Sequence, residues 1–169
     1  EKLIQSLASE PFRSGRIHTG VLDEIGPLPA EVPPPAGDLA LIAEALETAN
    51  TNSDIRCAVI MGASGAFSAG NDLQDFLRAA QGGEGLGHSV LRFLSALARC
   101  EKPLVAAVQG VAVGVGTTML LHCDLVYAGE SARFQLPFVN LALCPEAASS
   151  LLLPRLVGLK KATEIALLG

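Results

Sequence analysis

The strongest constraint on the fold is a run without any charged residue, from Pro103 to Leu121. Its length approaches that of a membrane-spanning helix. However, a proline opens the run, three glycines interrupt it at Gly110, Gly114 and Gly116, and its first residues favour a strand. We therefore predict a buried strand, a glycine-rich loop and a buried helix in this segment.

Apolar runs of strand length recur along the chain, with helical patterns between them. The expected strands are Cys57–Met61, Leu104–Val108 and Leu125–Ala128. Strands that are apolar throughout and alternate with helices are typical of a parallel sheet covered by helices, so we predict an α/β fold. The expected helices are a segment capped by Asp38 that ends at Thr51, Asp72 to about Ala80, Ser89–Arg99 and Val115–His122.

Two of these strands lead into glycine-bearing loops that run into helices. We expect one loop at Gly62–Gly70 and the other at Gln109–Gly116. In open α/β sheets, ligands bind at this carboxyl edge, where the free N–H groups of a helix start point toward negative charge. Neither loop has a phosphate-binding signature. The glycines alone fit tight turns equally well, so the loops leave both interpretations open.

Composition narrows the range of functions. There are 12 Lys and Arg against 17 Asp and Glu, and the formal charge of −5 disfavours a nucleic-acid partner. Hydrophobic residues make up 50% and charged residues 17%, which excludes a disordered chain. No metal site or disulfide framework is expected from the spacing of the cysteines, and no signal peptide from residues 1–20, so we expect a cytoplasmic protein without a membrane span. The cysteines are Cys57, Cys100, Cys123 and Cys144.

The first part of the chain differs in composition from the rest. Prolines are concentrated between Pro27 and Pro35, where they break regular structure. We predict two parts: a divergent segment with a proline-rich linker at 1–37, and a folded core at 38–169. Within the core, Gly82 to Gly87 form a glycine bridge that we expect to be flexible.

Three linked motifs resemble the crotonase, or enoyl-CoA hydratase/isomerase, superfamily. They are Ala66–Leu73, Lys102–Gly110 and Cys123–Ala128, in that order and spacing. The resemblance implies a β-β-α spiral fold, a coenzyme A thioester as substrate, no separate cofactor, and a homotrimer or dimer of trimers. It also implies that the backbone N–H groups of Asn71 and Val115 stabilise a thioester enolate.

The same resemblance implies a set of substrate-binding residues around these loops. Complete family members also begin with a further strand pair and continue beyond Gly169, so we expect a member truncated at both ends. The implied substrate-binding residues are Ala66, Ala69, Gly70, Leu73, Gly114 and Phe138.

The acid and base residues decide the reaction. The two hydratase glutamates of the family match Thr118 and Phe138 here, so both carboxylates are missing. The segment from Leu136 to Ser150 is similar to the peroxisomal-type Δ3,Δ2-enoyl-CoA isomerase branch, in which the glutamate matching Glu146 is the catalytic base. A shift of a double bond needs only one base, which moves a proton from C2 to C4.

Other interpretations stay open at this point. Glu146 lies at the start of an expected apolar helix, where a carboxylate can simply complement the helix dipole. Its pKa would be lowered by that dipole and raised by apolar neighbours such as Phe138 and Leu143. The main hypothesis is an isomerase with Glu146 as base; the alternatives are a hydratase with unusual acid and base residues, or a non-catalytic acyl-CoA-binding module. Asp124 is expected to satisfy backbone donors beside a strand.

Overall fold

The computed structural model describes residues 39–62, 65–71 and 87–169. Several expectations lie outside these residues: the segment 1–37, the cap at Asp38, the helix 72–80, Leu73, and the glycine bridge up to position 86. The helix expected before Thr51 is confirmed as α4 (Leu39–Thr51).

In the described residues, six short strands form two parallel sheets. The first sheet has the order β1-β3-β5, and the second has the order β2-β4-β6. The three strands of the first sheet are those predicted from apolar runs, and β3 and β5 have the predicted bounds. The bounds are β1 (Ala58–Met61), β2 (Ala66–Ser68), β3 (Leu104–Val108), β4 (Val111–Val113), β5 (Leu125–Ala128) and β6 (Arg133–Gln135).

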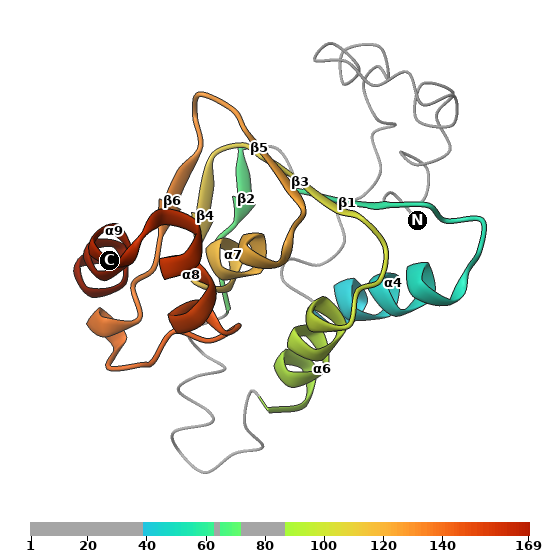
Figure 1. Cartoon of the computed structure of the whole chain (residues 1–169), viewed down its shortest axis with the longest axis horizontal. Coiled ribbons are helices and arrows are strands. Elements are labelled where there is room, and N and C mark those ends of the chain that lie inside the picture. The colour runs from blue at the N-terminus through green and yellow to red at the C-terminus, as the bar shows by residue number, and fades with distance from the viewer. Residues whose placement is uncertain (1–38, 63–64, 72–86) are drawn as a thin grey trace.

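The second sheet was missed from the sequence, which predicted only loops where β2 and β4 lie. Each of its strands has 3 residues, too few to show an alternating pattern. β2 pairs with β4 with a register shift between Ala66 and Ser68, and β4 pairs with β6 from Val111 to Val113. The chain therefore places one strand in each sheet before it enters a helix, and this confirms the β-β-α spiral (Figure 1).

Two helices pack together beside the first sheet. α6 (Gly87–Ala98) lies next to α4, as Figure 1 shows. Arg92 of α6 holds both carboxylate oxygens of Glu47 on α4, with a shortest N···O distance of 2.6 Å. Asn50 of α4 donates to the backbone carbonyl of Arg99 at 2.9 Å, so the end of α6 is also fixed.

The main core lies between these helices and the first sheet. β3 alternates, and its residues Leu104, Ala106 and Val108 face the core. β5 is different, because all four of its residues are exposed. The prediction of a parallel sheet flanked by helices is confirmed, and within the described residues β5 is the strand of this sheet that is left exposed. The main core cluster consists of Leu39, Ala43, Leu46, Ala58, Ile60, Phe67, Phe93, Ala96, Leu97, Leu104, Ala106, Val108, Ala112, Val115, Met119 and Leu120.

The helix expected at Val115–His122 is present but divided. It forms a single α-helical turn, α7 (Val115–Thr118), and continues as a 3-10 turn, η1 (Met119–His122). Asp124 follows, and its Oδ2 accepts the backbone N–H of Leu104 at 2.7 Å. The expected role of Asp124 as an acceptor for backbone donors is confirmed.

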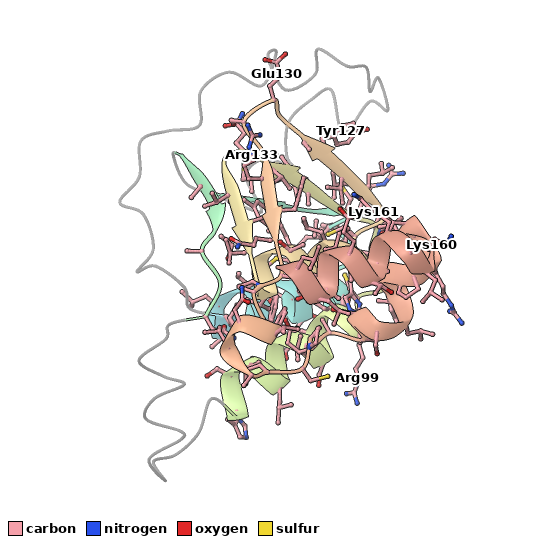
Figure 2. All side chains as sticks on the ribbon, turned by 90° about the vertical axis from the view of Figure 1, so that its left-hand side faces the viewer. Arg99, Tyr127, Glu130, Arg133, Lys160 and Lys161 are labelled. Carbon is pink, nitrogen blue, oxygen red and sulfur yellow. The ribbon has the colours of Figure 1, made fainter. Side chains whose placement is uncertain are left out.

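A smaller core lies at the C-terminal end of the described chain. A 3-10 turn, η2 (Val139–Leu141), leads toward α8 (Ser149–Val157) and α9 (Leu159–Leu168). Figure 2 shows Lys160 and Lys161 on α9, Glu130 at the turn between β5 and β6, and Arg133 at the start of β6. No helix of the described residues is long and apolar enough to cross a membrane. The smaller core consists of Leu136, Phe138, Leu153 and Ala162.

Candidate active site

The two glycine-bearing loops pack directly against each other. A Cβ atom added to Gly70 would lie 2.9 Å from the carbonyl oxygen of Val113, and one added to Gly116 would lie 2.6 Å from Cβ of Ser68. Real Cβ atoms do not approach this closely, so both contacts require glycine. The two glycines thus bring the end of β2 against the start of α7.

Two backbone N–H groups follow these contacts. Val115 is the first residue of α7, so its N–H has no acceptor inside that helix. Asn71 follows Gly70, whose φ of 89° turns the backbone at the end of the first loop. No described residue accepts the N–H of Asn71 or of Val115. Both predicted enolate donors therefore lie on neighbouring loops at the carboxyl ends of the paired strands β2 and β4.

The loop before α7 is anchored to the second sheet. Gly114 donates its N–H to the carbonyl of Gln135 at 2.9 Å, and Thr117 donates its hydroxyl to the carbonyl of Ala112. Gly114 has a φ of 56°, in the left-handed region that favours glycine. These bonds fix the position of the N–H group of Val115 at the start of α7.

Glu146 reaches this loop region from a distant part of the chain. The hydroxyl of Thr118, on α7, donates a hydrogen bond of 2.7 Å to Oε1 of Glu146. Thr118 is completely buried and Glu146 is half-buried, so the bond is partly shielded from water. The predicted base and the helix that carries a predicted enolate donor are therefore joined by one hydrogen bond.

The second carboxylate oxygen of Glu146 has a different environment. Oε2 is buried and has no hydrogen-bond partner among the described residues. Burial raises the pKa of Glu146 above its ordinary value, and this effect outweighs the hydrogen bond from Thr118 and the charge of His122, which both lower it. This direction agrees with the effect expected from apolar surroundings. A carboxyl group whose pKa is raised in this way holds a proton more readily than an exposed glutamate, as a group that takes up and returns a proton requires.

The backbone of Glu146 is held separately from its side chain. Its carbonyl oxygen accepts both the N–H of Ser149, at 3.0 Å, and the hydroxyl of Ser149. The two residues between them, Ala147 and Ala148, have φ values of 53° and 54°, which alanine rarely adopts. Glu146 therefore lies in a tightly turned segment before α8.

The position of this segment corrects one interpretation of Glu146. α8 begins at Ser149 and its N-cap residue is Ala148, so Glu146 lies outside the first helical turn. Its side chain bonds to Thr118 of α7 instead of the free N–H groups of α8. Complementing the dipole of the following helix does not explain this glutamate.

His122 lies near the same segment. Its Nε2 is 2.9 Å from the carbonyl oxygen of Ala147, and its charge lowers the pKa of Glu146. The sequence placed His122 at the end of a buried helix, and the structure places it at the last residue of η1. His122 therefore belongs to the surroundings of the candidate base.

The other predicted substrate-binding residues lie in several places. Ala69 is exposed, whereas Ala66, Gly70 and Gly114 are half-buried, and all four lie on the two loops or on β2. Phe138 is instead 7% exposed and packs in the smaller core.

The sequence identified Thr118 only as the site of a missing carboxylate. Its hydroxyl is the group that bonds to Glu146, and the signal that could have found it was its position three residues after Val115, on the same helical face.

Cys123 lies just beyond α7 and η1. Burial, with smaller effects from Asp124 and Cys100, raises the pKa of its thiol to about 12. The thiol of Cys123 thus stays protonated and is a poor nucleophile at neutral pH. No group of three or more metal-ligating side chains is found within the described part of the chain.

Comparison with known proteins identifies the relatives of this chain. It is 41% identical to 1,2-epoxyphenylacetyl-CoA isomerase of Escherichia coli K12, over 77% of this chain and 52% of the relative. It is 42% identical to enoyl-CoA delta isomerase 2 of Rattus norvegicus, over 74% of this chain and 33% of the relative. The chain thus spans about half, or less, of the length of these relatives.

A solved structure gives the same result for the fold. An enoyl-CoA hydratase/isomerase from Pseudoalteromonas atlantica T6c superposes with a TM-score of 0.71 at 50% identity, covering 78% of this chain and 51% of that one. The model of the enoyl-CoA hydratase/isomerase family matches residues 39–169, which include every described element. The chain belongs to the enoyl-CoA hydratase/isomerase family of the crotonase superfamily, as its three motifs indicated.

Proposed function

We propose that this chain carries the site of an enoyl-CoA isomerase, which shifts a double bond of an acyl-CoA thioester from the 3 to the 2 position. Glu146 is the base, and the backbone N–H groups of Asn71 and Val115 bind the thioester oxygen. The observation that carries the proposal is the carboxylate of Glu146, whose Oε2 is buried and whose Oε1 is bonded to Thr118 on the helix that begins at Val115.

The reaction needs one group that both takes and returns a proton. Glu146 removes a proton from C2, so the C2–H bond breaks, an O–H bond forms and the electron pair moves into a dienolate whose charge lies on the thioester oxygen. The two N–H groups stabilise that charge. Glu146 then returns the proton to C4, the C2=C3 double bond is left, and the carboxylate is regenerated.

The residues favour isomerisation over hydration. Hydration requires one group to activate water and another to protonate the α carbon. Thr118 bonds to one carboxylate, Glu146. By the family resemblance, Thr118 and Phe138 stand where hydratases have their two glutamates, and neither side chain can act as an acid or a base in their place. The names of the curated relatives include isomerases and a hydratase, so the choice rests on these residues.

An assay of the purified chain with 3-hexenoyl-CoA tests the proposal. Formation of the conjugated 2-enoyl thioester is followed by absorbance for the wild type, for Glu146→Gln and for Glu164→Gln. Glu164 is an exposed glutamate of α9 that pairs with Lys161 at 3.0 Å, so it controls for the loss of a carboxylate elsewhere. We expect Glu146→Gln to lose about 10²–10⁴-fold in kcat and Glu164→Gln to keep the wild-type rate.

Two results would contradict this function. Hydration of crotonyl-CoA by the wild type, faster than isomerisation, would favour the hydratase. Binding of an acyl-CoA without turnover of either substrate would favour a non-catalytic binding module.

A further inference from the structure

The hydroxyl of Thr118 has one proton and two acceptors within reach. Oε1 of Glu146 lies 2.7 Å from it, and the backbone carbonyl of Val115 lies 3.4 Å from it. The shorter distance and the charge of the carboxylate both favour Glu146, because hydrogen bonds to ionised groups are about twice as strong. The proton therefore lies between Thr118 and Oε1.

This bond makes the two oxygens of Glu146 unequal. Oε1 is occupied by Thr118, whereas Oε2 is buried and has no partner in the described residues. A buried oxygen without a donor is destabilised, and it is relieved when it takes up a proton. The unpaired oxygen is therefore the better proton acceptor of the two.

We propose that Thr118 is a positioning residue, which holds Oε1 of Glu146 so that Oε2 receives the substrate proton. This inference rests on the proposed function of Glu146 as the base. Thr118 touches the base and not the reacting atoms, and it acts by fixing the orientation of the carboxylate. In hydratases of this family, the matching position holds a glutamate. Here it holds Thr118, whose hydroxyl donates a hydrogen bond to another carboxylate, that of Glu146.

Several groups act on Glu146 besides Thr118. His122 of η1 is the titratable group whose charge acts on the carboxylate from a neighbouring element, and it lowers the pKa. Ser149 of α8 bonds to the backbone carbonyl of Glu146 and not to its carboxylate. A substitution at Thr118 that keeps these groups isolates the effect of one hydrogen bond.

Thr118→Val tests the proposal, because valine keeps the shape of threonine and removes the hydroxyl. The loss of a bond to the charged form raises the pKa of Glu146, so the acid limb of the kcat profile moves to higher pH by about one unit. We expect kcat to fall about tenfold or more with little change in KM, because the carboxylate loses its fixed orientation. Thr118→Ser keeps the hydroxyl, so we expect the acid limb of the kcat profile and kcat itself to return to their wild-type values.

A second measurement does not depend on turnover. The pKa of Glu146 is followed directly by NMR of chains with ¹³C-labelled glutamate carboxyl groups, with Glu146→Gln to assign the signal. Thr163→Val is the matched control, because Thr163 bonds only to the carbonyl of Leu159 on the exposed face of α9. Circular dichroism verifies that each variant is folded.

The outcomes separate this inference from the proposed function. A folded Thr118→Val chain with an unmoved titration of Glu146 would overturn the role of Thr118, and so would a shift that Thr118→Ser fails to reverse. A wild type that titrates as expected and does not isomerise would overturn the proposed function, while the titration still decides whether Thr118 holds Glu146.

Discussion

The two hydrophobic cores of this chain differ greatly in extent. The main core joins α4, α6, the first sheet and α7, and it buries Phe93 and Leu46 completely. The smaller core, between the end of β6 and the helices α8 and α9, is built around Leu136 and Leu153. On those two helices large apolar side chains are also exposed, at Leu151, Leu156, Leu159, Leu167 and Leu168.

The candidate site draws on both regions. Val115 and Thr118 belong to α7, which packs into the main core, whereas Glu146 lies on the segment that leads into the smaller one. Enolate stabilisation requires fixed donors, and the predicted donor Val115 lies in the better-packed core. Within the described residues, the candidate base Glu146 is held by Thr118, which bonds to its side chain, and by Ser149, which bonds to its backbone carbonyl.

The largest effect should come from the cores themselves. Phe93→Ala removes a fully buried ring, and we expect the free energy of unfolding to fall by about 3–5 kcal/mol. Leu153→Ala should cost about 2 kcal/mol, because a small, partly open core can collapse around the gap. Urea denaturation measures both, with exposed Leu91→Ala as control. Equal losses for Phe93 and Leu153 would remove the distinction between the cores.

A smaller effect should come from the contact between the two loops. Gly116→Ala would place a methyl group against Ser68, and overpacking of this kind costs about 1–3 kcal/mol. Since the added group separates the loops that carry Asn71 and Val115, the rate of the proposed isomerisation should fall with the stability. Gly129→Ala is the matched control, because its Cβ would lie 3.6 Å from its nearest neighbour. An active and stable Gly116→Ala chain would refute the close packing of the loops.

The pH dependence of stability should reveal the burial of Glu146. Its folded-state pKa is raised by burial above the unfolded value of about 4.5, so the folded chain binds the proton more tightly. The stability that this group contributes is full below the unfolded pKa and is lost as the pH rises through the folded pKa. As the pH rises from 4 to 8, the free energy of unfolding of the wild type should therefore fall relative to that of Glu146→Gln. Parallel curves would show that Glu146 is not buried.

The smallest effect should come from the turn before α8. Ala148 is exposed and has a φ of 54°, so Ala148→Gly removes backbone strain without a loss of packing. We expect a gain of up to about 1 kcal/mol, because the greater freedom of glycine in the unfolded chain offsets part of the relief. Ala162→Gly, inside α9, should instead lose about 1 kcal/mol. Thermal denaturation compares the two, and a destabilised Ala148→Gly chain would contradict the left-handed conformation.

Much of the fold was predictable where the residues repeat a pattern over several positions. The apolar runs of β3 and β5 and the helical stripe of α4 are long enough to identify, and their bounds agree closely with the structure. The strands β2, β4 and β6 were missed, because three residues show no period and because the pairing that defines them comes from distant parts of the chain.

The site was predictable only in part. Glu146, Asn71 and Val115 were candidates from the family resemblance, and the structure places the last two at the ends of paired strands. The hydrogen bond between Thr118 and Glu146 joins residues far apart in the chain, so no local pattern contains it. The pKa of Glu146 could not be assigned either, because burial depends on how α7 and the segment before α8 pack.

The spiral order of the strands also has a consequence for folding kinetics. β3 pairs with β5 through a short connection, with Val105 opposite Leu125, and pairs with β1 across a much longer stretch of chain, with Leu104 opposite Ala58. Loop closure becomes less favourable by about 0.6 kcal/mol for each doubling of length. β3 and β5 should therefore associate first, and β1 with α4 should join a sheet that has already begun to form, so the best-packed part of the native chain is completed late.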